Sequence, residues 1–102
     1  MVVVRYIYQA ATRLGEMGTL LQELFRPLPA AKAPHAARVY RAMTGSTDWR
    51  FAVEVEFESL ADWQEWVKQV YAYVPNADKR QRLTELMAGG ASVEAWELID
   101  LG

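Results

Sequence analysis

The order of hydrophobic patterns along the chain predicts an α+β fold, in which a four-stranded antiparallel sheet carries helices on one face. Alternating apolar residues mark strands, and apolar residues spaced three and four apart mark helices. These patterns follow one another in the order β, α, β, β, α, a short extra α, and β. A chain of 102 residues that is 52% hydrophobic has the size and composition of one folded domain, residues 1–102.

The first strand is predicted over residues 2–9, which are rich in β-branched and aromatic side chains and contain no glycine or proline. Successive side chains of a strand point to opposite faces, so Val4, Tyr6 and Tyr8 share one face and Arg5 lies on the other. The first helix is predicted over residues 17–25, where apolar residues follow a single helical stripe.

Pro27 ends this helix, because proline lacks the amide donor and clashes with the preceding turn. Residues 28–34 are rich in proline and alanine and are predicted to connect it to a second strand at residues 35–43. The small residues 44–48 are typical of a hairpin loop. The third strand, residues 49–57, is the clearest, because every second residue is apolar.

The second long helix is predicted to begin at Ser59, where Ser-Leu-Ala-Asp has the spacing at which a hydroxyl and a carboxylate satisfy free backbone amides. Its predicted buried stripe is Leu60, Trp63, Trp66, Val67, Val70, Tyr71 and Val74, and Pro75 ends it. Asn76 and Asp78 are expected to cap a short helix over residues 79–87, which the Gly89-Gly90 pair terminates. Residues 93–101 are predicted as the last strand.

This order of elements is the ferredoxin-like split β-α-β arrangement, which leaves one face of the sheet without helices. The residues expected toward the helices are Val4, Tyr6, Tyr8, Phe51, Val53, Val55 and Phe57. Those expected on the open face are Arg5, Ile7, Arg50, Glu54 and Glu56. Val3, Ile7 and either Trp96 or Leu98 add apolar surface there, so the sequence favours a homodimer over a monomer.

The composition excludes several classes of function. The chain has no cysteine and one histidine, which removes disulfides, thiol nucleophiles and nearly all histidine-based metal sites, so no metal is expected. A formal charge of -2 provides no basic surface for nucleic acid. No apolar run reaches the length of a membrane span or forms a signal peptide, so we expect a cytoplasmic protein without a membrane partner.

Residues 51–66, which read Phe-Ala-Val-Glu-Val-Glu-Phe-Glu-Ser-Leu-Ala-Asp-Trp-Gln-Glu-Trp, carry a family resemblance. They resemble the third strand and second helix of the dimeric α+β barrel superfamily, which includes antibiotic-biosynthesis-monooxygenase-like domains. The rest of the chain matches in element order and length. The resemblance implies that two sheets face each other in a dimer, with the helices outside, which would cover Arg5, Glu54 and Glu56.

In the haem-degrading and quinone-forming members, a tryptophan on the second helix cooperates with an asparagine on the first strand, and the haem branch adds a histidine after that helix. Trp66 stands at the position of that tryptophan. The first strand has only Gln9, the segment after the helix has Asn76, and His35 precedes the second strand. The resemblance therefore does not imply a haem monooxygenase, and no cofactor is expected.

Tyr6, Tyr8, Trp63 and Trp66 are the candidate ligand-binding residues. They would line an aromatic cleft between the helices and the sheet, the usual place for a ligand in the family that the chain resembles. Aromatic residues at this spacing are more often part of a packed core, although the two interpretations overlap where a cleft opens between the layers. The leading hypothesis is a homodimeric barrel protein that binds a small apolar or aromatic molecule, and the alternative is a cofactor-independent monooxygenase or isomerase.

Other polar residues allow two interpretations each. His35 has the side-chain type of a general base, but its place after Pro34 is typical of an exposed loop. Arg38 and Arg41 could bind a carboxylate ligand or pair with Glu54 and Glu56 across strands. The two glutamates could hold a metal or act as an acid-base pair, but salt bridges to Arg5 and Arg50 are favoured. The basic run 79–82 is expected to be a solvated helix face.

Overall fold

The computed structural model describes residues 1–26, 34–43 and 49–99, and within them it confirms the predicted ferredoxin-like fold. The elements are β1 (Val2–Gln9), α1 (Leu14–Leu24), β2 (Ala36–Arg41), β3 (Arg50–Phe57), α2 (Leu60–Ala72), a 3₁₀ turn (Val74–Asn76), α3 (Ala77–Leu86) and β4 (Ser92–Glu97). The predicted connection at residues 28–34 lies almost wholly outside the described residues, and so do the hairpin loop 44–48 and the end of the last predicted strand.

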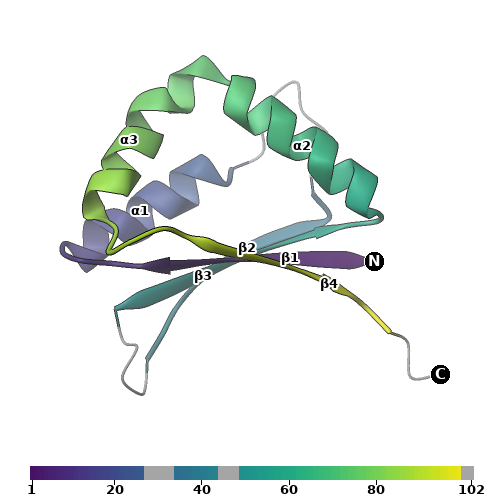
Figure 1. Cartoon of the computed structure of the whole chain (residues 1–102), viewed down its shortest axis with the longest axis horizontal. Coiled ribbons are helices and arrows are strands. Elements are labelled where there is room, and N and C mark those ends of the chain that lie inside the picture. The colour runs from purple at the N-terminus through teal and green to yellow at the C-terminus, as the bar shows by residue number, and fades with distance from the viewer. Residues whose placement is uncertain (27–33, 44–48, 100–102) are drawn as a thin grey trace.

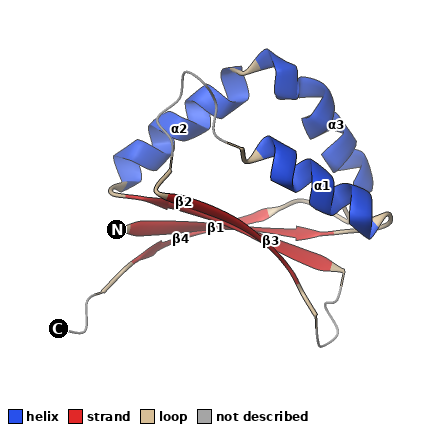
Figure 2. Ribbon diagram, turned by 180° about the vertical axis from the view of Figure 1, so that it is seen from behind, coloured by secondary structure: helices blue, strands red, loops and turns tan. Residues whose placement is uncertain are grey.

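The sheet has the strand order β2-β3-β1-β4, and every neighbouring pair is antiparallel. The α-helices α1, α2 and α3 cover the same face of the sheet, and no described residue forms a helix on the opposite face (Figure 1; Figure 2). In the described part of the chain, no helix has the length and apolar composition needed to cross a membrane. The fold therefore has two layers, and its core lies between them.

The register of the strands decides which side chains meet in that core. Val4 lies opposite Val55 on one side and Ala95 on the other, and Tyr6 lies opposite Val53 and Val93. Directly opposed residues of an antiparallel pair share a face of the sheet. The residues expected toward the helices are buried or partly buried in two apolar clusters, as predicted.

The first cluster lies beneath α1 and α3, and the second beneath α2. Two ion pairs tie α3 to α1. The Arg82 guanidinium donates to both carboxylate oxygens of Glu16, at 2.6 and 3.1 Å, and Lys79 lies 3.6 Å from Glu23. The hydrogen bond from Arg82 lowers the pKa of the Glu16 carboxyl. These contacts place α3 beside the end of β1 that carries Tyr8.

Several predicted element ends and faces were wrong. The first helix begins at Leu14, because Arg13 adopts a left-handed backbone (φ 53°) that turns the chain into the helix. The third helix begins at Ala77, and Asn76 makes no side-chain cap, because its backbone is helical within the 3₁₀ turn. Leu60, in the first turn of α2, and Tyr71, at the cavity, are exposed rather than buried. The last strand ends at Glu97.

The predicted start of α2 is confirmed and yields a stability prediction. The Ser59 hydroxyl accepts a hydrogen bond from the Asp62 amide at 3.2 Å. Replacing Ser59 with alanine leaves that amide without its partner and should cost about 1 kcal/mol of the free energy of unfolding, measured by urea denaturation. Ser59→Asp keeps an acceptor and is the control. Equal losses in both variants would contradict a capping role.

Candidate functional site

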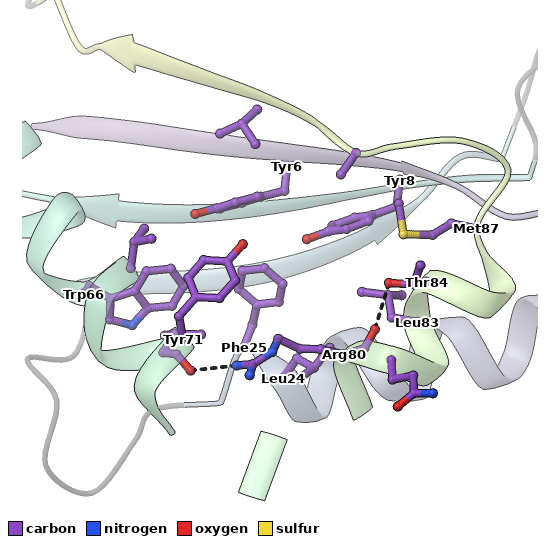
Figure 3. Close-up of a pocket in the computed structure, with 15 residues that line it drawn as sticks. Tyr6, Tyr8, Leu24, Phe25, Trp66, Tyr71, Arg80, Leu83, Thr84 and Met87 are labelled. Atoms are coloured by element: carbon purple, nitrogen blue, oxygen red, sulfur yellow. Dashed lines mark hydrogen bonds between the residues drawn. The ribbon is translucent and has the colours of Figure 1, made fainter. Parts of the chain in front are cut away.

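A cavity of about 500 Å³ lies between the helices and the sheet. Its walls come from the second half of β1, the end of α1, the last two turns of α2, one side of α3 and the start of β4 (Figure 3). Most of the lining is apolar or aromatic, and it includes Leu24, Val67, Val70, Leu83, Met87 and Val93. A concave, largely apolar space with a few polar groups is the usual form of a small-molecule site.

Aromatic rings make one continuous wall of this cavity. The Tyr6 and Tyr8 rings lie nearly parallel with centroids 6.5 Å apart, and Phe25 contacts Tyr6 at 5.2 Å. Trp66 stacks on Phe25 at 5.9 Å and contacts Phe57 at 5.6 Å. Rings at these separations attract one another, so the wall keeps its shape without a ligand.

The hydroxyls of Tyr6 and Tyr8 are the polar groups of this wall. The Trp63 indole Nε1 donates to the Tyr6 hydroxyl oxygen at 2.9 Å, which leaves the Tyr6 hydroxyl proton free to donate. Among the described residues, the Tyr8 hydroxyl has no hydrogen-bond partner, although the residue is buried. Because Tyr8 lines the cavity and its hydroxyl is not bonded to another described residue, this hydroxyl can donate a hydrogen bond to a bound molecule.

Both phenols stay protonated at neutral pH. Burial raises the pKa of Tyr6 above its ordinary value, and the hydrogen bond from Trp63 offsets part of that rise. Burial also raises the pKa of Tyr8, and the neighbouring phenols of Tyr6 and Tyr71 add to the effect. The two groups therefore act as hydrogen-bond donors toward an oxygen or nitrogen acceptor.

One cation also lines the cavity. Arg80, from α3, donates through Nη1 to the Val70 carbonyl oxygen at 3.0 Å, and its Cζ lies 5.4 Å from the centroid of the Tyr71 ring. The described residues that line the cavity include no carboxylate and no histidine, so this site lacks the usual general bases. The geometry is suited to holding an aromatic molecule that carries hydrogen-bond acceptors.

The structure brings three of the four predicted ligand residues to this cavity. Tyr6, Tyr8 and Trp66 line it, whereas Trp63 does not and instead contacts Tyr6 through its indole nitrogen. Sequence reasoning missed the contribution of α3, above all Arg80. The basic run that contains Arg80 suggested only a solvated face, and the sequence carries no sign of which of its members turns toward the sheet.

The predicted residues of the open face lie where expected. Arg5 donates to Glu54 Oε1 through Nε and Nη2, at 3.0 and 2.8 Å, and Arg38 donates to Glu56 at 3.0 Å. Arg50, at the start of β3, also has an interaction partner. The favoured salt bridge between Arg5 and Glu54 is thus confirmed, and Glu56 pairs with Arg38, the cross-strand alternative, in place of the favoured arginines. The described residues contain no group of three histidine or acidic side chains suited to a metal.

The remaining candidates lie away from the cavity. His35 is exposed and lies 3.3 Å from the Glu58 carboxylate, in the loop position that its neighbour Pro34 suggested. Arg41 lines a shallow groove on the open face together with Tyr40 and Arg5. Neither residue contacts the aromatic cavity, so neither belongs to that site.

Solved structures share this fold at low sequence identity. A Bordetella bronchiseptica protein assigned as an antibiotic biosynthesis monooxygenase is 15% identical, with a TM-score of 0.72 over 96% of each chain. SnoaB, a cofactor-independent oxygenase from Streptomyces nogalater, is 8% identical, with a TM-score of 0.70 over 97% of this chain and 93% of SnoaB. A variant of MhuD with two manganese protoporphyrin IX groups bound per active site is 20% identical, with a TM-score of 0.67 over 100% of this chain and 99% of that chain.

No protein-family model and no curated protein sequence matches the chain. The fold is the one seen in solved structures of antibiotic biosynthesis monooxygenase proteins, as the resemblance of residues 51–66 implied. At these identities the likeness shows the fold alone.

Proposed function

We propose that this protein binds a small, flat aromatic molecule with at least one hydrogen-bond acceptor in the cavity between its helices and sheet. The observation that carries the proposal is the Tyr8 hydroxyl, which belongs to a residue of the aromatic wall that lines the cavity and has no partner among the described residues. The ring of such a molecule would contact Tyr6, Phe25 and Trp66, and its acceptor would take the proton of Tyr8.

The test uses two probes that are both built on a fused two-ring system. N-phenylnaphthylamine becomes fluorescent in apolar pockets, and naphthoquinone carries carbonyl acceptors on the same ring system. Tyr8→Phe should weaken naphthoquinone binding about fivefold, because one hydrogen bond is lost, and should leave N-phenylnaphthylamine binding unchanged. Calorimetry measures the affinity for naphthoquinone, and fluorescence measures the affinity for N-phenylnaphthylamine. The chain has no cysteine, so the quinone forms no thiol adduct.

Tyr40→Phe is the control, since Tyr40 is an exposed tyrosine on the opposite face of the sheet. If neither probe binds the unmodified protein, the cavity is not a ligand site and the proposal is wrong. If both tyrosine variants weaken naphthoquinone equally, the quinone does not bind at Tyr8.

A second candidate function is a cofactor-independent oxygenase. It rests on Trp66, which lies at the cavity wall where the resemblance implies a functional tryptophan, and on the fold that the chain shares with SnoaB. A dihydroxynaphthalene and O₂ would give a hydroxynaphthoquinone and water, with the substrate supplying all the electrons. The test measures oxygen uptake above the uncatalysed rate. If the Trp66→Phe variant takes up oxygen as fast as the unmodified protein, Trp66 has no part in the reaction. The described residues that line the cavity include no general base. We therefore propose ligand binding first, and catalysis, whether oxygenation or isomerisation, second.

We also propose that two copies pair through the open sheet faces. Trp96 is 54% exposed there, with Val3 opposite it in the neighbouring strand, and Ile7 lies four residues further along β1. The charges between these apolar residues are paired within the chain, as in Arg5 with Glu54, which lowers the cost of taking them out of water. A face of this kind favours contact with a second copy. The cytoplasmic location stays a prediction.

A further inference from the structure

Arg80 is the one charged side chain among the described residues that line the aromatic cavity. It comes from the first half of α3 and reaches the last turn of α2 (Figure 3). There its Nη1 donates to the Val70 carbonyl, and its guanidinium lies against the face of the Tyr71 ring. These two contacts hold the side chain at the cavity wall.

The charge of Arg80 has no carboxylate partner within the described residues. Other arginines of the chain differ: Arg82 is bonded to Glu16 and Glu85, and Arg5 to Glu54. A carbonyl oxygen and a ring face attract the cation but do not neutralise it. A partly buried cation beside an apolar space is stabilised by an anion that enters that space.

We propose that the cavity selects aromatic acids, with the carboxylate or sulfonate of the ligand bound by the N–H groups of Arg80 that the Val70 carbonyl leaves free. The guanidinium plane is suited to two parallel hydrogen bonds with a planar carboxylate. The ligand ring then lies along the wall of Tyr6, Phe25 and Trp66. This inference rests on the proposed function and makes the ligand class more specific, from any flat aromatic molecule to an anionic one.

The experiment compares two fluorescent probes that share one ring system. Anilinonaphthalene sulfonate carries a negative charge, and N-phenylnaphthylamine is its neutral counterpart. The unmodified protein should bind the sulfonate more tightly than the neutral probe. Arg80→Gln should weaken sulfonate binding about tenfold, because a charge-assisted hydrogen bond is lost, and should change binding of the neutral probe less than twofold. Glutamine retains a donor for the Val70 carbonyl.

Arg41→Gln is the matched control, because Arg41 is an exposed arginine beside the groove on the open face. It should leave the affinity for both probes unchanged. Raising the salt concentration should weaken sulfonate binding in the unmodified protein and have a smaller effect in Arg80→Gln, since screening acts on the charge interaction.

The outcomes separate this inference from the proposed function. If the neutral probe binds and the sulfonate binds no tighter, the cavity is a ligand site and Arg80 does not select anions. If Arg80→Gln weakens both probes equally, Arg80 only maintains the shape of the cavity, and the inference is wrong. If Arg41→Gln weakens the sulfonate instead, the anion binds on the open face. If neither probe binds, both proposals fail.

Discussion

Replacing Trp66 with alanine should lower the free energy of unfolding by about 3–5 kcal/mol, the range for removing a large buried aromatic side chain. Trp66 is 3% exposed and contacts both Phe57 on β3 and Phe25 after α1. It therefore joins α2 to the sheet and to the end of the first helix. Because a domain of this size has about 5–15 kcal/mol in total, the loss would be a large part of its stability.

Urea denaturation followed by circular dichroism measures this loss. Trp49→Ala is the control. Trp49 lies directly before β3 and is 43% exposed, so its removal leaves a smaller cavity. We expect Trp49→Ala to cost less than half as much as Trp66→Ala. Similar losses would mean that Trp66 is not a central packing residue, and the aromatic wall would then need another support.

Replacing both Glu54 and Glu56 with lysine should convert the proposed dimer to monomers. In the protein as it is, Arg5 donates to Glu54 and Arg38 to Glu56, so each glutamate neutralises an arginine on the open sheet face. Two lysines would lie beside Arg5, Arg38 and Arg50 on this face of each copy, and a second copy would bring the same positive charges against them. Like charges brought together out of water repel strongly, so the association should weaken by at least about a hundredfold.

Size-exclusion chromatography coupled to light scattering measures the change, because a chain of 11.6 kDa and its dimer differ twofold in mass. Glu58→Lys with Glu65→Lys is the control, since both residues are exposed and lie outside the open sheet face, and the change in formal charge is the same. A monomeric unmodified protein would contradict the dimer directly. A dimer that survives the substitutions would show that pairing uses another surface.

The order of elements could be read from local patterns, and the reason is physical. Strict alternation in residues 49–57 requires a strand with one apolar face, because side chains in a strand alternate between faces. The Ser59 cap marks the start of α2 through bonds within four residues. The cross-strand pairing of Arg5 with Glu54 also follows from alternation, once the two strands are neighbours.

Features that depend on contacts between residues far apart in the sequence could not be predicted from local patterns. The hydrophobic stripe of α2 predicted that Leu60 and Tyr71 are buried, but both are exposed, while Val70 beside Tyr71 packs against the core. Trp63 and Trp66 look equivalent in sequence, yet Trp66 lines the cavity and Trp63 contacts the Tyr6 hydroxyl.

Local patterns predicted the α+β class, the antiparallel sheet, its apolar and charged faces and most of the aromatic wall, because periodicity and capping are local properties of the chain. They did not predict that α3 closes the cavity or that Arg80, rather than another member of its basic run, lies at the cavity wall. Which side of α3 faces the sheet depends on contacts between residues far apart in the chain: Leu83 and Leu86 are buried in the core with α1, and the Glu16–Arg82 and Glu23–Lys79 pairs join the same two helices.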